Sequence, residues 1–147
     1  MDNNEFERLL KLEKHFDQPK SFRFPEHGSQ KIFSLTSVCK SEKFFLDFDR
    51  SGKIVFKLTN QLRQDSTPLV RIDINSPPHI NPNGNIVGRN HVHLYKEHFG
   101  LAYAYELDSI FSLEIDKTNV LDIFINFCYY CNIVHKNIDD IKMQGVL

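Results

Sequence analysis

The sequence predicts an α+β fold, in which a twisted antiparallel sheet of about five to seven strands carries the first and the last helix on its apolar face. Two observations favour this fold. Runs in which apolar and polar residues alternate, as in half-buried strands, fill the middle of the chain. Apolar residues at helical spacing occur near both ends. With 147 residues, 41% of them hydrophobic and 25% charged, the chain is expected to form one globular domain over 1–147.

The first helix is predicted from Asn3 to Phe16. Asp2 lies three residues before Glu5, which is the spacing of a capping box at a helix start. Because proline cannot continue the helical hydrogen bonding, Pro19 places the end of this helix before it. The apolar positions at helical spacing are Phe6, Leu9, Leu10 and Phe16.

Alternation next predicts two strands, at 31–39 and 43–49. A third alternating run, 54–58, follows a short turn at 50–52 that contains glycine. Strands 43–49 and 54–58 are therefore expected to form a hairpin. Residues 59–68 are mostly polar and are predicted to be a connecting loop.

Two further alternating runs, 69–74 and 91–95, are predicted to pair as antiparallel strands. The segment 75–90 between them contains two adjacent prolines and an Asn-Pro-Asn-Gly turn. It is expected to be a long loop, and loops of that length in a compact domain often carry function. The remaining strands are predicted at 101–107 and 111–115.

The last helix is predicted from Thr118 to Ile138, where apolar residues follow a helical stripe. Cys128 and Cys131 lie within this stripe, which favours buried packing over a redox or zinc motif. A second apolar row flanks it, at Leu121, Ile125 and Tyr129. We therefore expect the two helices to touch, and a homodimer to form through the apolar surface that they leave uncovered.

Charge and composition exclude several classes of protein. A net charge of −1 gives no overall positive field, so nonspecific wrapping of nucleic acid is not expected. No apolar run reaches the roughly 18–20 residues of a membrane-spanning helix, and no secretory signal is recognisable. Three cysteines without such a signal indicate reduced thiols in a cytoplasmic protein. No cofactor is indicated.

Titratable side chains of several kinds converge on the two predicted strands that flank the 75–90 loop. Alternate residues of a strand point to opposite faces, so the polar residues of each strand form one row. The side chains that this pairing brings to one face are Arg71, Asp73, His91, His93 and Tyr95. His79 lies in the loop that connects the strands, and we expect it to reach the same face.

Residues 71–95 contain Arg-Ile-Asp, then Pro-His-x-Asn-Pro-Asn-Gly, and then His-x-His-x-Tyr. This pattern resembles an uncharacterised family of small bacterial and phage proteins, catalogued as a domain of unknown function. The resemblance implies that His79, His91 and His93 belong to the signature of that family. It implies no activity, so the function stays open.

The first functional hypothesis is cleavage of RNA without a metal, as in toxin-like endoribonucleases. Imidazole titrates near neutral pH, so two histidines can act as general base and general acid at one phosphate. His79 on the loop and either His91 or His93 on the strand would form this pair. Arg71 would offset the charge that develops on the phosphate. The residues expected to contact RNA or another partner are Asp73, Asn81, Tyr95 and Lys96.

Two alternatives stay open. One is a phage or mobile-element inhibitor that binds a host or defence protein through the same row of side chains, since Tyr and Arg are common at such interfaces. The other is a cupin-like metal site. His91-x-His93 followed by Glu97 matches the first half of the cupin motif, and His79 or Glu97 would complete the ligands. This match is partial, because Asn85 stands where the motif has glycine and no second half follows.

Overall fold

The computed structural model describes residues 1–17, 25–52, 57–111 and 115–134. In chain order, its helices and strands are α1 (Asn3–Lys11), β1 (Lys14–Phe16), β2 (Gln30–Ser37), β3 (Lys43–Asp49), β4 (Leu58–Gln64), β5 (Thr67–Ile74), β6 (His79–Ile80), β7 (Ile86–Val87), β8 (His91–Leu94), β9 (Ala104–Glu106), α2 (Leu107–Ile110), α3 (Val120–Tyr130) and β10 (Ile133–Val134). Among these residues, eight strands form one sheet in the order β10-β1-β2-β3-β4-β5-β8-β9. Every neighbouring pair in it is antiparallel except β1 and β10. Strands β6 and β7 form a separate hairpin.

The predicted α+β class with a mostly antiparallel sheet is confirmed, although the sheet has more strands than the five to seven expected. Its additional strands, β1 and β10, lie where the sequence predicted the ends of the two long helices. The start of α1 agrees with the prediction, since the Asp2 carboxylate accepts a hydrogen bond from the Glu5 N–H at 2.7 Å. However, α1 ends at Lys11, and β1 then pairs with β2. After α3, Asn132 adopts the left-handed conformation that ends helices, with φ of 54°.

Strand β4 corrects the prediction of a connecting loop at 59–68. Its polar residues alternate with Leu58, Asn60 and Leu62, which are buried, so it is an ordinary half-buried strand whose sequence is mostly polar. Asp49 on β3 pairs with Thr59, which makes the connection longer than the predicted turn at 50–52. Most of the predicted strand 54–58 lies outside the described residues.

The region after β8 also differs from the prediction. The expected strand 101–107 is shorter, because β9 covers Ala104–Glu106 and is followed at once by the short helix α2. The strand predicted at 111–115 lies partly outside the described residues, as does the end of the predicted last helix beyond residue 134.

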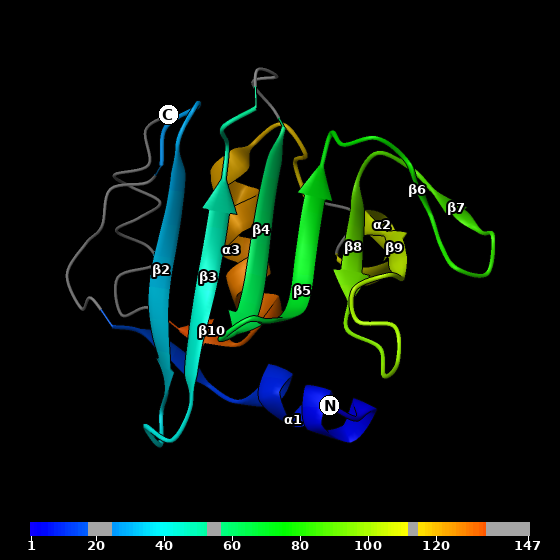
Figure 1. Cartoon of the computed structure of the whole chain (residues 1–147). Helices are drawn as coiled ribbons and strands as arrows, with labels where there is room; N and C mark the ends of the chain where they lie inside the picture. Colours follow the sequence, from blue (N-terminus) through cyan, green and yellow to red (C-terminus); the bar gives the residue numbers. More distant parts are fainter. Residues whose placement is uncertain (18–24, 53–56, 112–114, 135–147) are drawn as a thin grey trace.

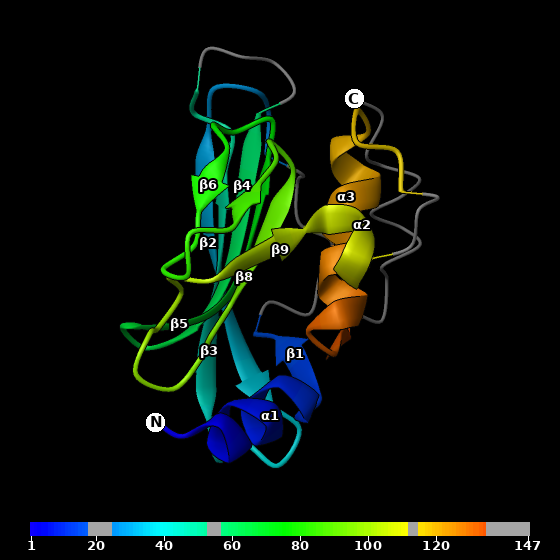
Figure 2. The same cartoon turned by 90° about the vertical axis from the view of Figure 1, so that its right-hand side faces the viewer.

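The molecule has a layer of helix on one face of the sheet. In Figure 1 the sheet is seen from its other face, with α3 behind β3 and β4 and with α1 across one end of the strands. Figure 2 shows the sheet edge-on, with α2 and α3 on one side of it. The β6–β7 hairpin stands at the β8–β9 end of the sheet, on the side opposite α3 (Figures 1 and 2).

The core between the sheet and α3 is rich in phenylalanine and includes Phe6 and Leu9 of α1. In the second apolar row of the predicted last helix, Leu121 and Ile125 are buried within this chain. Tyr129, the third residue of that row, is 63% exposed. The apolar surface behind the homodimer prediction is therefore mostly covered by the chain itself. Cys128 and Cys131 are buried and unpaired, as predicted. In the described ranges, no helix is both long and apolar enough to cross a membrane.

Candidate functional site

The pairing of β5 with β8 brings the predicted polar side chains together. Asp73 stands opposite His91 and Arg71 stands opposite His93 in the antiparallel register. The intervening residues Ile72 and Val92 are fully buried in the core, as the period-two pattern predicted. The polar row therefore lies on the sheet face opposite α3.

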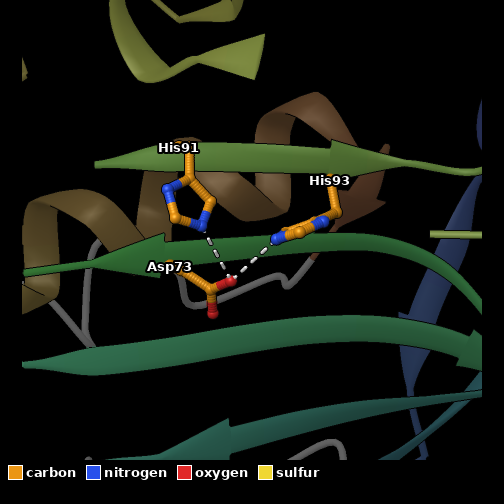
Figure 3. A group of neighbouring side chains, drawn as sticks. All are labelled: Asp73, His91 and His93. Carbon is orange, nitrogen blue, oxygen red and sulfur yellow. Dashed lines mark ion pairs between the residues drawn. The ribbon is translucent and has the colours of Figure 1, made fainter. Parts of the chain in front are cut away.

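Asp73, His91 and His93 form a compact group on this face. Asp73 Oδ2 is 3.4 Å from His91 Nε2 and 3.2 Å from His93 Nε2. Figure 3 shows both imidazoles descending from β8 toward this single oxygen on β5. One potential ligand atom from each of the three residues lies within 4.8 Å of the others. Both histidines are buried, at 2% exposure each, and Asp73 is nearly as buried.

Two backbone carbonyls determine the state of the imidazoles. His91 Nδ1 is 2.7 Å from the Gly88 carbonyl oxygen, and His93 Nδ1 is 2.7 Å from that of Leu101. Because a carbonyl oxygen can only accept, each Nδ1 must carry the hydrogen. In the neutral form, each Nε2 then has a lone pair directed toward the Asp73 carboxylate. Three electron-pair donors thus converge on one point.

Asp73 is held as a carboxylate. Burial alone would raise its pKa, but a hydrogen bond from His93 when that imidazole is protonated, the positive charge of Arg71 and the hydroxyl of Thr59 outweigh that effect and lower the pKa to about 2. Thr59 Oγ1 donates to Asp73 Oδ1 at 2.9 Å, and Arg71 Nε donates to Oδ2 at 3.0 Å. Arg71 Nη2 also lies 3.1 Å from His93 Nε2, where it donates to the imidazole.

The loop between β5 and β8 covers the group, which is therefore buried although it lies on the sheet face opposite α3. The His79 ring lies with its centroid 4.7 Å from that of His93, and its Nε2 is 2.7 Å from the Ala102 carbonyl oxygen. The Asn81 amide both donates to the carbonyl of Ala104, at 2.9 Å, and accepts from its N–H, at 2.8 Å. Asn81 was predicted to contact a partner, but its amide is occupied by this backbone.

Three other predicted residues lie apart from the histidines. Strand β8 ends at Leu94 and the chain turns, so the alternating row does not continue. Tyr95 donates from its hydroxyl to the Met1 carbonyl at 2.6 Å, and its ring packs near α1. The Lys96 ammonium lies 4.4 Å from the centroid of the Tyr103 ring. The Glu97 N–H donates to Asn3, and its carboxylate is not in the group that Asp73 forms with the histidines.

Sequence reasoning missed the groups that support the site. Thr59 was assigned to a loop, because the strand that carries it lacks a run of alternating apolar residues. The carbonyls of Gly88 and Leu101 have no signature in a sequence, since every residue has one. Asp73, which was predicted to contact RNA or another partner, lies at the centre of the group.

One protein family, DUF6978, which is described as a family of unknown function, matches residues 1–133. The prediction that the chain belongs to an uncharacterised family is thereby confirmed, and the match covers most of the chain. No curated protein and no solved structure matches the sequence. The chemistry of the site therefore has to be inferred from its own geometry.

Proposed function

We propose that this chain, which belongs to the DUF6978 family of unknown function, binds one transition-metal ion through Asp73, His91 and His93. The observation that supports the proposal is the convergence of two imidazole Nε2 atoms and a carboxylate oxygen, with both Nδ1 atoms hydrogen-bonded to carbonyls. In metal sites, such a contact at the second ring nitrogen fixes the tautomer and orients the ligand.

Two of the three spacings between the ligand atoms match those around one ion, and all three atoms lie within 4.8 Å of one another. Nitrogen and oxygen ligands bind zinc at about 2.0–2.2 Å, so neighbouring ligands of one tetrahedral or octahedral ion lie about 3.0–3.5 Å apart. The observed distances from Asp73 Oδ2 to the two Nε2 atoms, 3.2 and 3.4 Å, fall in this range. A carboxylate and two imidazoles suit zinc, iron or manganese. Three protein ligands leave a position open for water or a small ligand, as in catalytic rather than structural sites.

The other two hypotheses have less support. Cleavage of RNA needs a whole RNA strand, rather than a small anion, to approach an imidazole, yet His91 and His93 are buried and both their ring nitrogens have neighbours. RNA cleavage stays a prediction. Toxicity when the protein is expressed, together with loss of that toxicity in His91→Ala, would support it. Inhibition of a host or defence protein also stays a prediction, and co-purification of such a protein would support it.

Metal content tests the proposal. We expect about one zinc or iron per chain after purification without a histidine tag, or after loading and gel filtration. Asp73→Asn, His91→Gln and His93→Gln should each lower the affinity at least about tenfold to a hundredfold, because a ligand is lost. His98→Gln is the matched control, since the side chain of His98 is 83% exposed and lies outside the group. Equal metal content in all four variants and the wild type would contradict the proposal.

A further inference from the structure

Arg71 lies where a metal ion would make its bonds. Its Nε atom is 3.0 Å from Asp73 Oδ2, and its Nη2 atom is 3.1 Å from His93 Nε2. The guanidinium therefore donates to two of the three candidate ligand atoms. A neutral imidazole nitrogen has one lone pair, so His93 Nε2 cannot accept from Arg71 and bind a metal at the same time.

The guanidinium can leave this position while the site keeps its shape. The Arg71 side chain is 36% exposed, whereas the side chain of Asp73 is 8% exposed. The two strands that carry the group are fixed to each other by the β5–β8 ladder, which does not involve side chains. A rotation of Arg71 toward solvent thus uncovers His93 Nε2 without moving the ligands.

We propose that Arg71 closes the empty metal site and, once displaced, binds a small oxyanion beside the metal. This inference rests on the metal binding proposed above. Three protein ligands leave open positions on the ion, and an arginine has paired donors that match a carboxylate, sulfate or phosphate. An anion that contacts both the metal and Arg71 holds the guanidinium away from His93. Metal and oxyanion therefore bind cooperatively, each raising the affinity for the other by the same factor.

Arg71→Ala tests the closing contact, with zinc affinity as the readout. Removing a cation that competes for two ligand atoms should tighten zinc binding about tenfold to a hundredfold. Arg63→Ala is the matched control. It removes the same charge from a neighbouring strand, where Arg63 contacts Asp47 rather than the candidate ligands. Zinc affinity should change by no more than about twofold in this control, because a distant charge is screened by salt.

Sulfate, exchanged for chloride at constant ionic strength, tests the anion. In the wild type, sulfate should raise the zinc affinity about threefold to tenfold, which is a typical coupling between two sites. In Arg71→Ala this rise should disappear. That variant keeps all three ligands, so any change of its zinc affinity in sulfate shows how far sulfate itself lowers the free zinc concentration. This change is subtracted from the one seen in the wild type.

The outcomes separate the two proposals. If neither the wild type nor Arg71→Ala binds zinc, the metal function itself is overturned. If both bind zinc equally, with no sulfate dependence in either, the role of Arg71 is overturned and the metal site stands. Arg71→Lys covers a failure of Arg71→Ala to fold, since it keeps the charge and loses the planar pair of donors. It should show tighter zinc binding than the wild type and a weaker response to sulfate.

Discussion

At the scale of single residues, His91 and His93 each contact a backbone carbonyl through Nδ1, and this contact decides what the opposite ring nitrogen can do. In the neutral imidazoles the hydrogen is on Nδ1, so both Nε2 lone pairs face Asp73, which is a buried carboxylate. Electron pairs that face one another in a buried place need a cation between them. Arg71 donates hydrogen bonds to two of the three candidate ligand atoms, Asp73 Oδ2 and His93 Nε2, whereas a metal ion would bind all three.

Asn60 gives a prediction at the same scale. It is fully buried on the core side of β4, and neither of its amide atoms has a hydrogen-bond partner within the described residues. Leucine has the same branched shape without the polar atoms, so Asn60→Leu should raise the free energy of unfolding by about 1–3 kcal/mol. Urea unfolding followed by circular dichroism measures this difference. A loss of stability would instead indicate that the amide binds a buried water molecule.

At the scale of elements, side chains of the loop between β5 and β8 form hydrogen bonds with the outer backbone edge of β9 and the residues before it, as a neighbouring strand would. His79 contacts the carbonyl of Ala102, and Asn81 contacts both the N–H and the carbonyl of Ala104. An unpaired strand edge exposes donors and acceptors that other chains can use, and side chains here occupy them. The same contacts place the loop over His91 and His93.

Asn81→Ala should therefore loosen the cover of the site. The variant leaves the Ala104 N–H and carbonyl without partners, which should cost about 1–3 kcal/mol of unfolding free energy. The Ala104 N–H should also exchange with deuterium faster. Asn83→Ala is the control, because Asn83 is an exposed neighbour whose amide contacts only the N–H of Asn85 among the described residues. Equal exchange at Ala104 in both variants and the wild type would show that the loop is held in another way.

At the scale of the whole molecule, Lys14 joins the ends of the two main helices to the sheet. Its ammonium group is fully buried and donates to the carbonyls of Leu10 and Leu12, at the end of α1, and of Cys131, at the end of α3. These carbonyls belong to the helix ends that lack partners within the helix. Burial lowers the pKa of Lys14 to about 8, so the charged form with its three donors still prevails at neutral pH.

Lys14→Met should lower the free energy of unfolding at pH 7 by about 2–4 kcal/mol, because buried acceptors lose their donor. The two proteins should also respond differently to pH. Between the folded pKa of about 8 and the ordinary value of about 10.4, Lys14 holds its proton in the unfolded chain but loses it in the folded one. The contribution of Lys14 to the free energy of unfolding therefore increases as the pH rises.

Urea unfolding of the wild type and Lys14→Met should be measured at pH 7.5 and 9.5. The difference between their free energies of unfolding should be about 2 kcal/mol larger at the higher pH. Burial raises the pKa of Cys131 to about 12, which acts in the opposite direction, but this thiol is present in both proteins and its effect largely cancels. A difference in unfolding free energy that decreases as the pH rises would contradict this account of Lys14.

The parts of the fold and site that the sequence predicted are those with a strict local pattern. The alternation in 43–49 and around His91 predicted strands and the face of their polar residues correctly. The polar strand β4 and the short strands β1 and β10 have no such pattern. Strand β4 is stabilised by its pairing with β3 and β5, and β10 by its pairing with β1 at the other end of the chain. Glu97 was chosen as a ligand from its spacing, whereas the carboxylate that reaches the histidines, Asp73, comes from a strand pairing.

Anomalous diffraction from crystals loaded with zinc would test the proposed metal site most directly. We predict one peak within about 2.0–2.2 Å of His91 Nε2, His93 Nε2 and an oxygen of Asp73, with Arg71 turned away from His93. A zinc peak found only at exposed histidines such as His98, with Arg71 still donating to Asp73 and His93, would contradict it.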